Sequence, residues 1–368
     1  MRFPEFTEEW KEERLSKIAE LSKGVGISKE QLSEDGEPCI LYGELYTKYK
    51  SEIIHKVISK TNIESSNLKR SKRNDVIIPC SGETAIDIAV ARCVPFDNII
   101  LGGDLNIIRL HKDDGAFMAY QLNGKRKIDI AQLAQGVSVV HLYGENIKAI
   151  KTYNPCLQEQ QKIVKLLSML DERIEVQNKI IEKLETLIKG IRNNIISKIK
   201  GDCITLQDIA DIYQPQTIAS TDLTEDGYLV YGANGIIGKY RSFNHEKEQI
   251  CITCRGNTCG TVNFTEPKSW ITGNAMVINT DNYAKNVNKR YLFHYLSSIN
   301  FNSIISGSGQ PQIVRQPLAK LKLILPVLII QNRIAECLDA MFAKMKNEQS
   351  FLQILQIQKS CLLSQMFI

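Results

Sequence analysis

The sequence predicts an α+β protein with an internal duplication: two mixed α/β domains, separated by two long helices that form an antiparallel coiled coil, related by a pseudo-two-fold axis. Two observations predict this fold class. A ladder of ten positions, whose steps alternate between four and three residues, recurs 171 positions later in the same register. Each copy also follows a similar helix start. This step pattern is that of the a and d positions of a coiled-coil seam.

The ladders are strongly apolar, with nine apolar residues in the first and eight in the second, in a chain that is 43% hydrophobic. Each spans 33 residues, or about 50 Å of helix. The first consists of Ile163, Leu167, Leu170, Ile174, Gln177, Ile181, Leu184, Ile188, Ile191 and Ile195. The second consists of Ile334, Leu338, Met341, Met345, Glu348, Leu352, Leu355, Lys359, Leu362 and Met366.

The helix starts repeat as well. Pro155 precedes the first ladder and Pro326 the second, and glutamine or asparagine follows each proline at the same offset. Proline just before a helix is a boundary signal. The predicted layout is therefore a first domain over 1–154, a long helix over 155–200, a second domain over 201–325 and a long helix over 326–368.

Short β-prone runs punctuated by glycine and asparagine predict mixed α/β domains. These runs are Val76–Ile78, Ile99–Leu101, Val137–Leu142, Tyr228–Tyr231, Ile250–Thr253, Met276–Ile278 and Leu321–Leu325.

The simplest partner for each apolar ladder is the other one, although each could instead pack on its own domain. An unbroken period of 3.5 residues favours a supercoiled pair. Duplicated units related by a two-fold axis pair head to tail, so we expect antiparallel helices. Gln177 and Glu348 are polar breaks at equivalent ladder positions, and we expect them to set the register.

Composition permits nucleic-acid binding without requiring it, because the net charge is +5. Ten cysteines without a regular framework, and no signal peptide, indicate a reducing cytoplasm. No apolar run reaches the length of a membrane span. Cys251, Cys254 and Cys259 suggest zinc, but a fourth ligand at suitable spacing is missing, so we expect no metal site.

Catalytic motifs are missing from the chain. Its five histidines are scattered, and no phosphate-binding GxxxxGK[ST] loop occurs. Asn154-Pro155-Cys156 matches only half of an amino-methyltransferase loop and is better explained as a helix start. We therefore expect a chain that binds and positions but is not an enzyme.

Several local motifs resemble one family, the specificity subunits of type I restriction-modification systems. The resemblance extends over essentially the whole chain. Its motifs are Arg2–Phe6 with Trp10, Gly26–Ser33 leading to Tyr42–Tyr49, Tyr231–Gly235, Gly307–Gln312, and the helix openings Pro155–Gln161 and Pro326–Asn332. The second opening departs at Ile330, where the family commonly has glutamate.

The resemblance implies a cytoplasmic recognition subunit without catalytic activity. Each domain would be a target-recognition domain that reads half of a bipartite sequence in double-stranded DNA. The coiled coil would set the gap and dock methyltransferase (modification) subunits, which would bring S-adenosylmethionine for DNA methylation. A separate motor-nuclease (restriction) subunit would bring ATP and magnesium. No cofactor is expected on this chain.

A span of about 50 Å corresponds to roughly 15 base pairs, so helix length would determine the gap. Two alternatives remain open: a coiled-coil docking adaptor without DNA specificity, and a fused nuclease or methyltransferase. DNA binding would exclude the first, and the missing motifs argue against the second.

Candidate DNA contacts are cationic, amide and tyrosine side chains in basic or turn-rich segments, although a run of charge is commonly just solvated surface. In the first domain they are Tyr42, Lys48, Lys69, Arg70, Lys72, Arg73, Lys125, Arg126 and Lys127. In the second they are Tyr231, Asn234, Lys239, Arg241, Arg255, Asn257, Gln310, Gln312 and Arg315.

Overall fold

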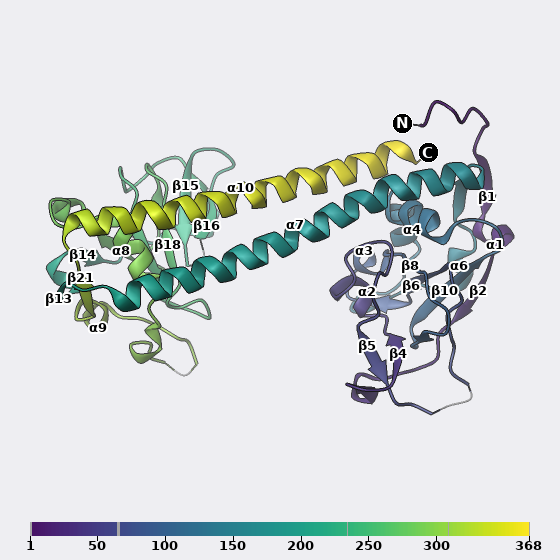
Figure 1. The fold of residues 1–368 in the computed structure, drawn as a ribbon, viewed down its shortest axis with the longest axis horizontal. Helices are drawn as coiled ribbons and strands as arrows, with labels where there is room; N and C mark the ends of the chain where they lie inside the picture. Colours follow the sequence, from purple (N-terminus) through teal and green to yellow (C-terminus); the bar gives the residue numbers. More distant parts are fainter. Residues whose placement is uncertain (1, 65–66, 234, 308, 368) are drawn as a thin grey trace. The chain divides into compact units, whose positions relative to one another are not determined.

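The fold was obtained as a computed structural model that describes residues 2–64, 67–233, 235–307 and 309–367. The chain forms two compact units (Figure 1). The first unit combines residues 1–178 with 350–368, and the second contains residues 179–349. Each of the two long helices, α7 (Leu157–Lys198) and α10 (Leu328–Met366), therefore contributes one half to each unit.

Strands of the first unit are β1 (Lys11–Arg14), β2 (Ala19–Lys23), β3 (Leu32–Ser33), β4 (Glu37–Ile40), β5 (Ser59–Thr61), β6 (Asp75–Pro79), β7 (Ser81–Gly82), β8 (Arg92–Val94), β9 (Ile100–Leu101), β10 (Leu105–Leu110), β11 (Val140–His141) and β12 (Lys151–Asn154). Its short helices are α1 (Leu15–Ile18), α2 (Glu44–Thr47), α3 (Ala85–Ile88), α4 (Gly115–Asn123), α5 (Lys127–Gln132) and α6 (Gly144–Ile147).

Strands of the second unit are β13 (Asp202–Thr205), β14 (Asp211–Tyr213), β15 (Tyr228–Gly232), β16 (Gly235–Tyr240), β17 (Ile250–Thr253), β18 (Val262–Phe264), β19 (Trp270–Ile271), β20 (Ala275–Asn279) and β21 (Lys322–Leu325). Its short helices are α8 (Lys289–Leu296) and α9 (Arg315–Ala319). Every predicted β-prone run overlaps a strand.

The two units share one sheet topology. A four-stranded antiparallel sheet has the order β2-β10-β6-β8 in the first unit and β14-β20-β17-β18 in the second. A second sheet has four strands in the first unit, in the order β3-β5-β4-β9, and three in the second, in the order β16-β15-β19. In it β4 pairs in parallel with β9, as β15 does with β19. Finally, β1 pairs with β12 and β13 with β21. The mixed α/β class and the internal repeat are confirmed.

Pairing of the long helices within the first unit is antiparallel. Ile163 and Leu167, near the start of α7, share a buried cluster with Met366 at the end of α10. Further along α7, Arg173 places its guanidinium over the Phe351 ring, earlier in α10. As the residue number increases along α7, the residue number of its contacts on α10 therefore decreases.

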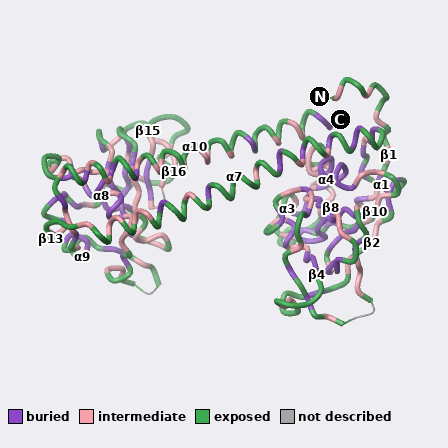
Figure 2. Tube along the Cα trace, in the orientation of Figure 1, coloured by how far each residue is buried: buried purple, intermediate pink, exposed green. Residues whose placement is uncertain are grey.

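In the second unit, late α7 meets early α10, because Ile196 and Ile334 both pack against the buried cluster that contains Ala335. All twenty ladder positions are buried or half-buried, and residues between them are largely exposed (Figure 2). Gln177 is 5% exposed and Glu348 is half-buried. Their role in register stays a prediction.

A buried glutamine joins the start of each long helix to its unit. The Gln160 side chain accepts a hydrogen bond from the Asp114 backbone N–H at 2.8 Å and donates to the Pro155 carbonyl at 2.9 Å. Gln331 accepts from the Asn288 N–H at 2.8 Å and donates to the Pro326 carbonyl at 2.8 Å.

These glutamines are equivalent, since Asp114 caps α4 and Asn288 caps α8. Both are at most 1% exposed. Because buried backbone groups must be hydrogen-bonded, each glutamine determines where a long helix leaves its domain.

Replacing Gln160 with leucine should lower the free energy of unfolding by about 1–3 kcal/mol, because the Asp114 N–H and the Pro155 carbonyl lose their partner. Urea unfolding monitored by circular dichroism measures this loss. Gln161→Leu is the matched control, because Gln161 is exposed. Equal stability of the two variants would contradict the proposed role of Gln160 in joining the start of α7 to its unit.

Candidate nucleic-acid interface

Five segments of the second unit meet in what we term the second-unit loop group: 214–217, 231–235 without 234, 253–260, 272–274, and 306–313 without 308. Backbone hydrogen bonds join them. The Cys254 N–H donates to the Asn274 carbonyl at 3.1 Å, and the Cys254 carbonyl accepts from Ile313 at 3.0 Å.

Side-chain hydrogen bonds also join the other two segments to the group. The Thr253 hydroxyl donates to the Ala233 carbonyl, and the Gln214 side chain donates to the Gly273 carbonyl at 3.1 Å.

A reciprocal pair of backbone bonds closes the last of these loops. Ser306 donates to the Gln312 carbonyl at 2.9 Å, and Gln312 donates to the Ser306 carbonyl at 2.8 Å. The Gly256 N–H donates to the Pro311 carbonyl at 3.0 Å, which holds the 253–260 loop beside it. Gly256 has φ +85°, a left-handed conformation that favours glycine.

The chemistry of this group suits a polyanion with hydrogen-bonding edges. None of its residues is acidic, and most are glycine, serine, threonine, asparagine or glutamine. Arg255, Asn257, Gln310 and Gln312 are all exposed. Arginine and amide side chains are those that bind phosphates and base edges.

The first unit has an equivalent loop group, consisting of residues 23–26, 41–43, 80–84, 102–104 and 135–143. Cys80 donates to the Asp104 carbonyl at 2.7 Å, and its own carbonyl accepts from Leu142 at 2.7 Å. Gln135 and His141 close their loop through two reciprocal backbone bonds of 2.9 and 2.7 Å. This bonding matches that of Cys254, Ser306 and Gln312.

Sequence reasoning missed three exposed residues of the first-unit loop group: Lys23, His141 and Tyr143. The Lys23 ammonium lies 5.9 Å from the Tyr143 ring centre, and the His141 and Tyr143 rings are 6.4 Å apart. A signal was available in the sequence. The 171-residue offset that relates the ladders also relates Gln135 to Ser306 and His141 to Gln312.

The basic segment 69–73 runs beside the first-unit loop group. The Lys69 carbonyl accepts from Leu101, next to the loop at 102–104, and the Arg73 N–H donates to the Asp97 carboxylate at the far end. The Arg70 guanidinium forms a bidentate pair with Glu37, at 2.6 and 2.8 Å, which lowers the pKa of Glu37.

Of the other residues predicted in this part of the first unit, Lys72 is exposed and Tyr42 is half-buried. Lys48 is exposed but pairs with Glu44 at 2.7 Å.

The cations at 125–127 lie elsewhere: Lys125 and Arg126 are in the connection between α4 and α5, and Lys127 begins α5. The adjacent Gly124 packs against α10, where a Cβ would lie 3.1 Å from the Leu363 carbonyl oxygen. Arg126 pairs with Asp129 at 3.0 Å and lies over the Tyr153 ring. The structure does not bring these three cations to the loop group.

In the second unit, Lys239 and Arg241 lie at the other end of the β15–β16 hairpin. Gly235 begins β16 within the loop group, so Lys239 lies about 13 Å away along the strand. Lys239 approaches Asp226 at 3.9 Å, and Arg241 lies over the Tyr240 ring. Arg315 is exposed, just beyond the loop group, and donates to the Ile212 carbonyl at 2.7 Å.

The expectation that Tyr231 contacts DNA is corrected by its burial. Tyr231 is 6% exposed and packs with Cys251, Ile271 and Val277. Its hydroxyl accepts from the Glu266 N–H at 3.0 Å, and burial raises the pKa of the phenol. This end of β15 is covered on both faces, since Val230, Tyr231 and Gly232 are all buried. Asn234 lies outside the described residues.

The cysteines that suggested zinc point into different parts of the core. Cys251 packs with Tyr231 and Ile271, whereas Cys254 belongs to the cluster around Tyr291. Burial raises the pKa of the Cys251 thiol. Across residues 2–64, 67–233, 235–307 and 309–367, no group of three potential metal ligands occurs. No helix in the same ranges is long and apolar enough for a membrane span.

Two similar domains with polar loop groups, joined by shared long helices, define a duplicated recognition protein. The model of the type I restriction modification DNA specificity domain matches residues 7–186 and 202–356, which together are most of the chain. The chain belongs to this family. The resemblance seen in the sequence is thereby confirmed.

Two curated relatives carry the same description. The EcoprrI type I restriction enzyme specificity subunit of Escherichia coli is 28% identical over 169 residues, which cover 45% of this chain and 41% of the relative. A putative type I restriction enzyme specificity subunit of Haemophilus influenzae is 28% identical over 116 residues, covering 31% and 29%. The matches thus span less than half of each relative. Both are named specificity subunits, which supports the non-catalytic class.

Solved structures share the fold over nearly the whole chain. The S subunit of a type I restriction-modification system from M. genitalium has a TM-score of 0.67 at 17% identity, covering 100% of this chain and 97% of that one. A structure from a study of complex assembly and conformational transition of the type I system has a TM-score of 0.59 at 15% identity, covering 98% and 97%.

Alanine at Arg255 should weaken binding to duplex DNA of any sequence and reduce the slope of log affinity against log salt by about one, because one phosphate contact is lost. Fluorescence anisotropy titrations at two salt concentrations measure both quantities. Arg241→Ala is the matched control, since Arg241 is an exposed arginine outside the loop group. A larger effect at Arg241 would place the interface on the other end of the hairpin.

Proposed function

We propose that this chain is the DNA-reading subunit of a type I restriction-modification complex, without catalytic activity of its own. Each unit reads one half of a bipartite target in double-stranded DNA. The observation that carries this proposal is the duplication itself: the family model matches both halves, and each half closes an equivalent loop with the same backbone bonds.

The loop groups supply the readers. In the second unit Gln310 and Gln312 offer donors and acceptors to base edges, while Arg255, Asn257 and backbone amides suit phosphates. In the first unit Lys23, His141 and Tyr143 take these roles, with Lys69 at the margin. The differing side chains on equivalent loops would make the two half-sites different sequences.

The long helices would set the unread gap. At about 1.5 Å per residue, the 42 residues of α7 extend roughly 63 Å. Two readers tied to such a helix would contact one duplex more than a helical turn apart, and each reader's own width would shorten the gap.

Partner subunits would dock on the outer faces of the helices. In the first unit, Leu166, Met169 and Val176 of α7 are 38–57% exposed, as are Phe351 and Ile354 of α10 at 38% and 60%. Apolar side chains in such numbers outside the ladder suit a helical partner. We assign methyltransferase subunits to this surface, together with S-adenosylmethionine on those subunits, and ATP and magnesium to the motor-nuclease subunit.

Lengthening both helices together should lengthen the gap. One heptad inserted after Asn178 and another after Gln349 would keep both ladders in phase and add about 10 Å, or roughly three base pairs. Single-molecule sequencing of methylated host DNA reads the gap directly. The half-sites themselves should stay unchanged.

In the control variant, the two inserted heptads replace residues 179–185 and 350–356, so the sequence changes but the helices keep their original length. An unaltered gap in the lengthened variant would contradict the proposal that helix length sets the gap. Absence of any duplex binding by the assembled complex would instead favour a docking adaptor and remove the proposed function altogether.

A further inference from the structure

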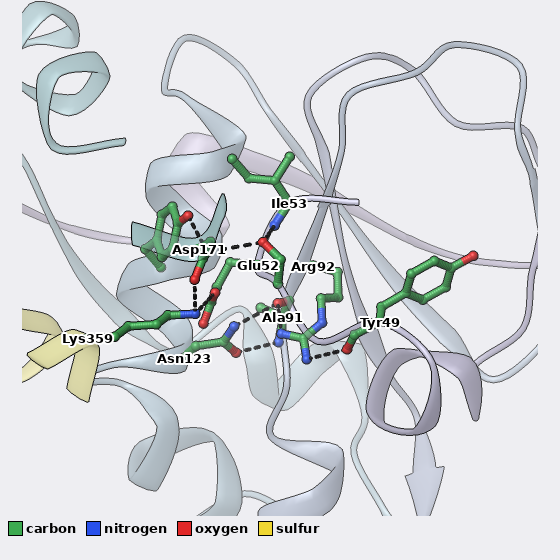
Figure 3. A network of polar contacts seen from close by, with 10 residues as sticks. Tyr49, Glu52, Ile53, Ala91, Arg92, Asn123, Asp171 and Lys359 are labelled. Atoms are coloured by element: carbon green, nitrogen blue, oxygen red, sulfur yellow. Dashed lines mark hydrogen bonds and ion pairs between the residues drawn. The ribbon is translucent and has the colours of Figure 1, made fainter. Parts of the chain in front are cut away.

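A buried ionic network joins the end of α10 to the first unit (Figure 3). The Lys359 ammonium lies 2.5 Å from the Glu52 carboxylate and 2.6 Å from the Asp171 carboxylate. The three side chains are 14%, 7% and 4% exposed. Asp171 also accepts hydrogen bonds from the Tyr120 hydroxyl at 2.7 Å and the Ser51 hydroxyl at 3.1 Å.

Charge balances in this network only while α10 is in place. Arg92, 7% exposed, is the second cation near Glu52, and its guanidinium donates to the Tyr49 and Ala91 carbonyls. Burial raises the pKa of Glu52, and it lowers the pKa of Arg92. Without Lys359, two buried carboxylates would share one cation, which is strongly unfavourable.

Equivalent positions in the other copy of the repeat are apolar. Lys359 occupies the eighth position of its ladder, and the eighth position of the first ladder is Ile188. The 171-residue offset likewise relates Asp171 to Phe342. In the second unit the Phe342 ring lies 5.3 Å from His294. His294 follows the α8 cap Asn288 by six residues, as Tyr120 follows the α4 cap Asp114.

This difference matters because the two ladders otherwise superimpose. The first half of α7 pairs with the last half of α10, but the late half of α7 from a second copy presents the same apolar pattern. In that wrong pairing, Ile188 of the second copy would stand where Lys359 belongs. Glu52 and Asp171 would then be buried with Arg92 alone.

The competing state has time to form during synthesis. Residues 199–327 must be made before α10 begins, which takes roughly ten seconds at ribosomal rates. During this interval the ladder of α7 has no partner from its own chain, and neighbouring copies supply the alternative helix.

We propose that the network of Glu52, Asp171 and Lys359 selects the helix that pairs with the first half of α7, favouring the chain's own α10 over the α7 of a second copy. Lys359 is the selecting residue, since it is the cation that only α10 brings. The inference rests on these contacts alone and is independent of DNA recognition.

The test uses two full-length copies with different affinity tags, expressed together. Wild-type copies should separate on the two resins. The triple variant Glu52→Gln, Asp171→Asn, Lys359→Ile has a neutral site that accepts either helix. Its copies should co-purify at least about tenfold more, because the penalty on the wrong pairing is removed. Lys346→Ile, at an exposed lysine of α10 outside the ladder, is the control.

Thermal unfolding of Lys359→Ile alone provides a second measurement. Its deficit relative to wild type should be large at pH 8 and smaller at pH 5, because Glu52, whose pKa burial raises, becomes neutral by binding a proton as pH falls. Tyr120, Arg92 and Cys93, the other titratable groups around the site, stay in one charge state over this range. A pH-independent deficit, or triple-variant copies that separate as wild type does, would overturn the proposal.

Discussion

Burial of the two apolar ladders is the constraint on which the rest of the structure depends. Each unit contains half of α7 and half of α10, so the first unit combines two separate stretches of sequence, 1–178 and 350–368, whereas the second is the continuous stretch 179–349. The domain cores continue into the helices: Phe117 and Tyr120 pack with Ile163 and Leu167, and Ala335 belongs to the main cluster of the second unit. A domain and its half of the helix pair are therefore stabilised together.

Burial of apolar surface is non-directional, so it does not determine which groups meet. Polar side chains supply this specificity. Gln160 and Gln331 determine where each helix leaves its domain, through hydrogen bonds that no apolar residue can replace. Ionic groups distinguish one unit from the other. The first unit has a lysine between two carboxylates, whereas the second has Asp339 paired with Arg290 at 2.5 Å and His294 at 2.7 Å.

Features that recur at a fixed spacing could be predicted from the sequence, whereas the meeting of loops that are distant in the sequence could not. The ladders and helix starts were readable because identical spacing recurs 171 residues later, and the predicted ranges lie within two residues of α7 and α10. Surface loops carry no such period. Basic residues in runs, such as Lys125, attract attention, yet only the folded sheet brings Arg255 beside Gln312. Tyr231 illustrates the same limit, since its motif gives no sign that this end of β15 is buried on both faces.

The loop stems have an evolutionary consequence. Gln135 with His141, and Ser306 with Gln312, close their loops through reciprocal main-chain hydrogen bonds, to which the Ser306 hydroxyl adds one at 3.4 Å. The reciprocal bonds do not depend on the side chains between the stems, so the enclosed residues can diverge while the scaffold and its helices stay intact. Such loops are modular: exchanging a few residues between the stems offers a route to new half-sites while the surrounding strands and helices stay unchanged.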